Sequence, residues 1–99
     1  MLDKEFFLGF VKVHILHHAS QQPVFGAELA QELGRHGYNL SPGTLYPTLH
    51  RLESDGYLKS SSKVVGGKVR KYYTITSKGI MALEESKTKI KQLVDEVLE

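Results

Sequence analysis

The sequence predicts a mostly helical α+β fold, and three features of its patterning carry the prediction. Apolar residues recur at helical spacing in three segments before residue 56. From Tyr57 the period changes to two, with Val, Tyr, Thr and Ile on either side of Gly66-Gly67, which is typical of a β-hairpin. Helical spacing returns at Ser77. Three helices, a hairpin and a last helix make a winged helix-turn-helix with a two-stranded β wing.

The first predicted helix covers residues 3–18 and begins at Asp3, whose carboxylate can cap free N–H groups. Its apolar residues are too many for one narrow stripe, so this helix must be buried on more than one side. In a domain of this size, the additional cover points to a second subunit. We therefore expect Phe6 and Phe10 to lie in a dimer interface.

The second and third predicted helices form the helix-turn-helix. The second runs from residue 25 or 26 to residue 35, and Gly37 ends it. Ser41-Pro42 gives the third helix an N-cap and a first residue, and Gly56 ends that helix. Its buried face is a stripe of leucines at i, i+4 and i+7, namely Leu45, Leu49 and Leu52.

The third helix carries polar side chains that suit DNA recognition. An arginine has paired donors for guanine, threonine methyl groups can touch thymine, and a helix N-terminus suits a phosphate. The candidate outward face comprises Ser41, Thr44, Thr48 and Arg51. The threonines could also be ordinary surface residues, and Arg51 could pair with Asp55 one turn later.

Positive charge is concentrated in the predicted wing. The net charge is only +2, yet residues 57–76 hold five bases and no acid, whereas the segments on either side are slightly acidic. The five bases are Lys59, Lys63, Lys68, Arg70 and Lys71. Such a focus marks a surface for a polyanion, with phosphate contacts at the wing. A hairpin that is merely solvated is the alternative.

The last predicted helix extends from Ser77, its expected cap, to about residue 98. Its apolar residues follow a heptad spacing interrupted by Lys87. Because about 22 residues span about 33 Å as a helix, it exceeds what the domain's own core can cover. We expect residues 1–76 to form the DNA-binding unit and residues 77–99 the dimerisation helix, with interface residues Ile90, Leu93, Val94 and Val97.

Two stretches resemble a known family. The run from Ser41 to Glu53, followed by Gly56-Tyr-Leu58, resembles the signature of PadR-family transcription regulators. Gly66-Gly67, the run from Arg70 to Thr76, and Lys78-Gly79 are similar to that family's wing and last-helix entry. The resemblance covers about residues 13–85, and the short last helix resembles the compact subgroup.

The resemblance implies a homodimeric repressor that binds a palindromic operator. We also expect an effector, either a small molecule or a metal ion, to release it from DNA. The residues that match in the recognition helix and the wing are Ser41, Thr44, Tyr46, Arg51, Lys68, Arg70 and Lys71. Tyr46 could instead belong to the core. Many members have His-Gly-Tyr where this chain has Phe25-Gly26-Ala27, and this chain has no tryptophan, so contacts made by those residues are absent.

An enzyme is not expected. There is no cysteine, no glycine-rich loop before a helix and no nucleophile motif around a serine. No cofactor is expected either. No apolar run approaches the ~18–20 residues that span a bilayer, so we expect a cytoplasmic protein without a membrane partner.

Two further hypotheses remain open. His14, His17 and His18 lie at i, i+3 and i+4, so their imidazoles could hold zinc or a similar divalent effector, with His36 or Glu28 completing the shell. These histidines could equally be interface or surface residues. The winged helix could also be a protein-interaction module, against which the basic wing argues.

Overall fold

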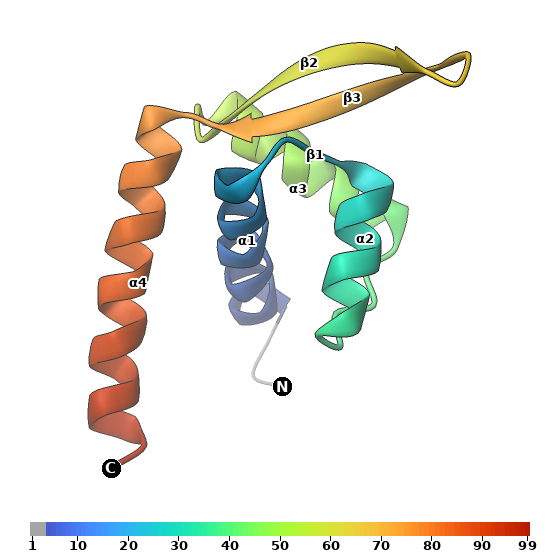
Figure 1. The fold of residues 1–99 in the computed structure, drawn as a ribbon. Helices are drawn as coiled ribbons and strands as arrows, with labels where there is room; N and C mark the ends of the chain where they lie inside the picture. Colours follow the sequence, from blue (N-terminus) through green and yellow to red (C-terminus); the bar gives the residue numbers. More distant parts are fainter. Residues whose placement is uncertain (1–3) are drawn as a thin grey trace.

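The computed structural model describes residues 4–99, and these form four helices and one three-stranded antiparallel sheet (Figure 1). In chain order the elements are α1 (Lys4–Gln21), β1 (Val24–Phe25), α2 (Gly26–Arg35), α3 (Pro42–Ser54), β2 (Leu58–Val65), β3 (Lys68–Ile75) and α4 (Ser77–Val97). The predicted α+β winged-helix architecture is confirmed. The expected cap at Asp3 lies outside the described residues.

Helix α1 occupies the centre of the molecule. Figure 1 shows it between α4 on one side and α2 on the other, with the sheet across its C-terminal end. Val11 and Ile15 are fully buried, and the core extends from them to the leucines of α2 and α3. The helix continues three residues beyond the predicted end, to Gln21, just before Pro23.

Helices α2 and α3 end in the same way. Gly37 and Gly56 follow the two helices with φ of +87° and +86°, a left-handed conformation that favours glycine. In each case the next residue donates its N–H to a leucine carbonyl five residues earlier, at 2.9 Å. These turns confirm the two predicted helix ends, and they fix the directions in which α3 and the wing leave the preceding helix.

The sheet has one strand more than predicted. Its order is β1-β3-β2, and β1 pairs with β3 through Val24 opposite Tyr73 and Phe25 opposite Tyr72. The predicted two-stranded wing is the β2–β3 hairpin, and β1 is an additional strand that the sequence analysis did not predict. A two-residue strand shows no alternation of its own, since only its pairing with β3 defines it.

The β2–β3 hairpin turns at Gly66-Gly67, as predicted. Both glycines have positive φ, +59° and +79°, which matches a type I′ turn and the twist of the strands. The hairpin extends past α2 in Figure 1, so its tip lies away from the helical body.

Helix α4 begins with a different cap from the one predicted. Thr76, not Ser77, is the N-cap, and its hydroxyl accepts the Gly79 N–H at 3.0 Å and donates to the Gly56 carbonyl at 2.6 Å. The hydroxyl of Thr76 can reach both groups because β3 delivers it beside the turn that ends α3. Residues 91–99 of α4 and its C-terminus are exposed. No helix within residues 4–99 is long and apolar enough to cross a membrane.

The close packing at Gly79 gives a stability prediction. A Cβ on Gly79 would overlap the Tyr57 carbonyl oxygen and the Ile75 side chain, whereas a Cβ on Gly34 would meet nothing within 4 Å. We expect Gly79→Ala to lower the free energy of unfolding by about 1–3 kcal/mol through overpacking. Gly34→Ala should raise it by about 0.5–1 kcal/mol, because alanine is the better helix former. Urea unfolding of both variants measures this; equal effects would contradict the packing described.

Candidate nucleic-acid interface

Helix α3, the predicted recognition helix, buries its leucine stripe and presents the opposite side to solvent. Leu45, Leu49 and Leu52 are buried, while Pro47 and His50 are exposed. At about 100° per residue, these two lie nearly opposite the stripe. Pro47 borders a hollow toward α1 and His50 borders a cleft toward β3, and the exposed surface between them is the part of α3 that can enter a groove.

Thr48 is not on the outward side, and its predicted orientation is wrong. Its side chain is 7% exposed, and its hydroxyl donates to the Thr44 carbonyl at 2.7 Å. Helical geometry places Thr48 about 60° from the middle of the leucine stripe, which is close enough to share its burial. Thr44, one turn earlier, is half-buried.

The start of α3 and Arg51 lie where the sequence placed them. Ser41 is the N-cap by its backbone, but its side chain makes no capping hydrogen bond and instead donates to the Thr44 hydroxyl at 3.3 Å. Arg51 is exposed, and the ion pair with Asp55 is not formed within residues 4–99.

Two lysines of α1 extend this basic surface. Lys4 and Lys12 line a shallow hollow of about 180 Å³ together with Thr44 and Arg51. Neither lysine was predicted from the sequence, because only the packing of α1 beside α3 brings them together. The sequence shows that α1 carries basic residues, but it does not show which side of α1 faces α3.

On its other side, α3 forms a cleft with β1 and the wing. The cleft has a volume of about 320 Å³, and Tyr46, His50, Phe25 and Arg70 are among its lining residues. Tyr46 is 42% exposed and is therefore not a core residue. Its ring lies so close to Gly26 that a Cβ there would overlap it. His50 was not predicted as a site residue. The sequence did contain a signal for it, because His50 directly follows Leu49 of the buried stripe and one helical step turns it outward.

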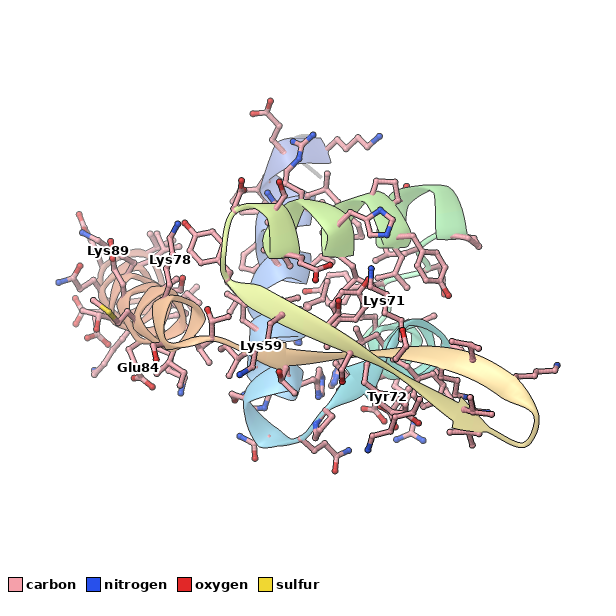
Figure 2. All side chains as sticks on the ribbon, turned by 90° about the horizontal axis from the view of Figure 1, so that it is seen from above. Lys59, Lys71, Tyr72, Lys78, Glu84 and Lys89 are labelled. Atoms are coloured by element: carbon pink, nitrogen blue, oxygen red, sulfur yellow. The ribbon has the colours of Figure 1, made fainter. Side chains whose placement is uncertain are left out.

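The register of the hairpin divides its basic residues between two faces. Lys63 lies opposite Arg70, so these two share a face with Lys59 and Lys68. Lys71 is on the other face with Tyr73. Figure 2 shows Lys71 directed toward α3, and Lys59 and Tyr72 directed away from it.

Arg70 and Lys63 are supported by aromatic rings. The guanidinium of Arg70 lies 4.6 Å from the centre of the Phe25 ring, and Lys63 Nζ lies 5.5 Å from that of Tyr72. Cation–π contacts of this kind orient the side chains without neutralising them. Both charges remain available for an anion.

Lys71 has a different environment, because its charge is balanced. Its ammonium lies 3.5 Å from a Glu53 carboxylate oxygen, and the other oxygen accepts the Ser60 hydroxyl at 2.5 Å. The neighbouring Tyr73 and then Glu53 raise the pKa of Lys71. The hydrogen bond from Ser60, followed by the charge of Lys71, lowers the pKa of Glu53. This trio ties α3 to both long strands.

An apolar groove runs along the junction of α1 and α4. Its volume is about 530 Å³, and the predicted interface residues Phe6, Phe10 and Ile90 line it. Further along α4, Leu93, Val94 and Val97 are exposed. An exposed apolar row beside an apolar groove is typical of a surface that meets another molecule.

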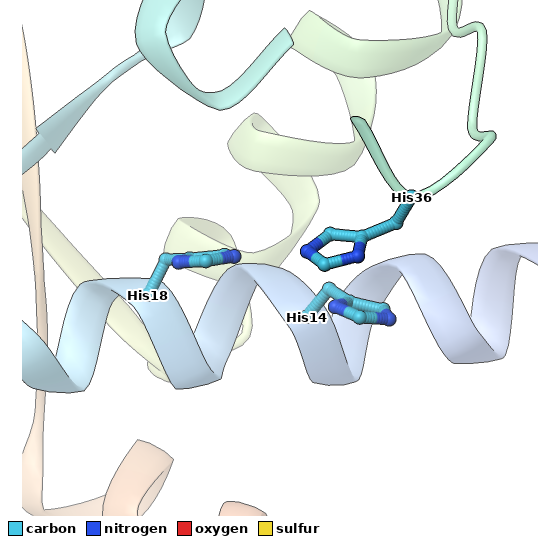
Figure 3. A group of neighbouring side chains, drawn as sticks. All are labelled: His14, His18 and His36. Carbon is cyan, nitrogen blue, oxygen red and sulfur yellow. The ribbon is translucent and has the colours of Figure 1, made fainter. Parts of the chain in front are cut away.

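The histidines gather as a trio, but not as the predicted one. His14 and His18 of α1 are joined by His36, which follows α2, and the three offer nitrogen atoms within 4.8 Å of one another (Figure 3). His17 is exposed and lies outside this group, as does Glu28. The helical step to residue 17 turns its ring away from the α2 side, where His36 lies.

The surroundings of His14 and His18 favour neutral imidazoles. Burial lowers the pKa of His14, and the neighbouring His36 and His18 lower it further. Burial also lowers the pKa of His18, with His17 acting in the same direction and Glu32 against it. His18 Nε2 is buried without a hydrogen-bond partner among the described residues.

A comparison with known families decides what kind of protein this is. The model of the PadR-like transcriptional regulator family matches residues 15–85, which is more than two thirds of the chain. The chain belongs to the PadR-like family of transcriptional regulators. That family consists of regulators rather than enzymes.

Individual transcriptional regulators are similar to this chain over nearly its whole length. A transcriptional regulator of Mycobacterium tuberculosis is 54% identical, covering 96% of this chain and 89% of its own. A PadR-family regulator of Eggerthella lenta is 35% identical with a TM-score of 0.83, covering 94% and 82% of the two chains. A PadR-like regulator of Bacillus cereus is 34% identical with a TM-score of 0.81, covering 97% and 98%.

The Glu53 trio makes stability depend on pH. Because the folded-state pKa of Glu53 is lowered, its ionised form adds stability above about pH 4.5, and this contribution is lost as the pH falls through the lowered value. We expect Glu53→Gln to be less stable than wild type near pH 7, with the difference shrinking toward pH 3. Thermal unfolding across pH measures it, with Glu96→Gln as the control, because Glu96 is an exposed position on α4 that forms no ion pair within residues 4–99. A difference that stays constant with pH would contradict this role.

Proposed function

We propose that this PadR-family protein is a sequence-specific DNA-binding repressor that acts as a homodimer on a palindromic operator. The observation that carries the proposal is the joint presentation of the outward side of α3 and a basic hairpin at one end of the molecule. In this arrangement α3 enters the major groove, where its side chains meet base edges.

Base recognition and phosphate contact fall to different residues. Arg51 can read guanine, and Tyr46 and His50 border the adjacent cleft. Lys63, Lys68 and Arg70 share one exposed face near the hairpin tip, where they can reach phosphates beside the neighbouring groove. Lys4 and Lys12 add positive charge on the other side of α3. Lys71 contributes chiefly through its ion pair with Glu53.

Dimerisation would use the groove between α1 and α4. Residues 4–99 leave the apolar row on α4 exposed beyond Ile90, and the groove beside it is lined by Phe6 and Phe10. Because a two-fold axis places the same surfaces against each other, the last turns of one α4 can enter the partner's groove. Two reading heads then meet two half-sites about one DNA turn apart.

Repression follows most simply from such a dimer, because a protein bound across a promoter excludes polymerase without further contacts. Release requires an effector that binds the free and the DNA-bound conformations with different affinity. If the protein is a repressor, the output of a reporter gene placed behind its own upstream region should rise when the protein is removed. If the protein is an activator, the output should fall instead.

The wing prediction separates phosphate contacts from base contacts. Lys68→Ala with Arg70→Ala should weaken binding to operator and to random DNA alike, and the magnitude of the salt slope should fall by about 0.9 for each phosphate that these side chains neutralise in wild type. Arg51→Ala should cost about 1–3 kcal/mol on the operator and little on random DNA. Fluorescence anisotropy over a salt series measures both effects.

A matched pair of lysines on α4 controls for net charge in that experiment. The double variant Lys87→Ala with Lys91→Ala also removes two positive charges, but here they belong to lysines that pair with Glu84 and Asp95 in the structure. Its salt slope should equal that of wild type. If the wing variant also keeps the wild-type slope, the wing does not contact DNA.

The dimer prediction uses two substitutions on α4. Val94→Asp places a charge in the apolar row, where burying an unpaired carboxylate is costly, and should leave a monomer that no longer binds two half-sites cooperatively. Gln92→Asp places the same charge on the opposite side of the helix and should remain dimeric. A chain that stops after Ser86 loses the whole row and should also be monomeric. Analytical ultracentrifugation at micromolar concentration decides, and a monomeric wild type would refute the interface.

A further inference from the structure

The histidine trio joins two parts of the molecule that act differently in the proposed regulator. His14 and His18 belong to α1, which lines the proposed dimer groove. His36 is the C-cap of α2 and the first residue of the turn that leads into α3. A ligand shared by the three side chains therefore connects α1 to the turn between α2 and α3 (Figure 3).

We propose that His14, His18 and His36 form a binding site for a divalent transition-metal ion of the zinc type. Three imidazole nitrogens are a ligand set suited to zinc, cobalt, nickel and copper, and a water molecule can supply the fourth position. The nitrogens already lie within 4.8 Å of one another. On one zinc ion, nitrogens at about 2.0–2.1 Å from the metal stand about 3.4 Å apart, so small side-chain rotations complete the site.

Two further features of the site favour a cation. His18 Nε2 is buried without a hydrogen-bond partner in the described part of the chain, and such a nitrogen gains from a ligand. The carboxylates of Glu28 and Glu32 lie close enough to His18 to act on its charge. These two acidic groups offset part of the positive charge that an ion would bring.

Metal binding requires the ring packing of the trio to change. The rings of His14 and His36 are stacked, with centres 5.1 Å apart and planes 27° apart. A stacked pair brings ring faces together, whereas ligation directs the lone pair in the plane of each ring toward the ion. Both rings must therefore turn, and Tyr38, whose ring meets His14 edge-on at 5.1 Å, must adjust with them.

The adjustment reaches the recognition helix through a short path. Residues 36–41 connect α2 to α3, so a shift at His36 and Tyr38 moves the start of α3 relative to α1. Metal binding itself does not depend on the proposed DNA function, but its regulatory effect does. By linkage, if the metal changes the affinity of the protein for its operator by some factor, the operator changes the affinity of the protein for the metal by the same factor.

Cobalt titration tests the site directly, because tetrahedral Co²⁺ absorbs visible light strongly. The full chain should bind one Co²⁺ per protomer, which Zn²⁺ displaces. His14→Gln and His36→Gln should each weaken binding at least about tenfold, since the loss of even an outer-shell partner costs about that much. His17→Gln, a histidine on the same helix outside the trio, should bind as wild type does. Equal binding by all four proteins, or an equal loss in His17→Gln, would overturn the site.

The regulatory effect is tested separately on operator DNA. Zn²⁺ should change the operator affinity of wild type by at least about fivefold and leave that of His36→Gln unchanged. His36 is exposed, so this variant should keep its fold, which circular dichroism checks. Metal binding without any change in operator affinity would overturn the regulatory role alone. If the metal-free protein binds no operator, the proposed DNA function fails while the cobalt spectrum still decides the site.

Discussion

Helix α1 is apolar around most of its circumference, and the rest of the molecule is arranged to cover it. One side meets α2 and α3 through Val11 and Ile15, which are fully buried. The sheet lies across its C-terminal end (Figure 1). Phe6 and Phe10 line the groove between α1 and α4. Burying the apolar surface of α1 that remains exposed in one chain would stabilise a complex with a second molecule. For this reason the proposed dimer uses the α1 surface.

The same helix explains how much of the fold could be predicted from sequence. Local signals were sufficient wherever a residue acts on its own neighbours: Gly37 and Gly56 ended helices, Gly66-Gly67 turned the hairpin, and the leucine stripe gave the buried side of α3. The PadR resemblance rested on such local runs, and the family match confirmed it. What failed depended on partners distant in the chain. Strand β1 exists only through β3, and Thr76 displaced Ser77 as a cap because the Gly56 carbonyl lies beside it.

The candidate site divides in the same way. Sequence alone predicted the helix α3 and the basic hairpin that follows it, but it could not tell which basic side chains have their charge balanced by an acid. Lys71 faces Glu53 because strand register places it on the α3 side, while Arg70, the residue before it, is on the opposite face. The helical step of 100° per residue already places Thr48 near the leucine stripe, yet the sequence analysis assigned it to the outward side. His36 replaced His17 in the trio because a turn after α2, rather than the next helical position, faces His14 and His18.

The position of β2 at the edge of the sheet has a consequence for self-association. An edge strand offers unpaired backbone groups that another chain could extend into a continuous sheet. Here β2 reads Leu-Lys-Ser-Ser-Ser-Lys-Val-Val, so two lysine charges and three small polar side chains lie along the edge. Stacking two such edges would bring like charges together. The strand edge is therefore an unfavourable place for two copies of the chain to pair.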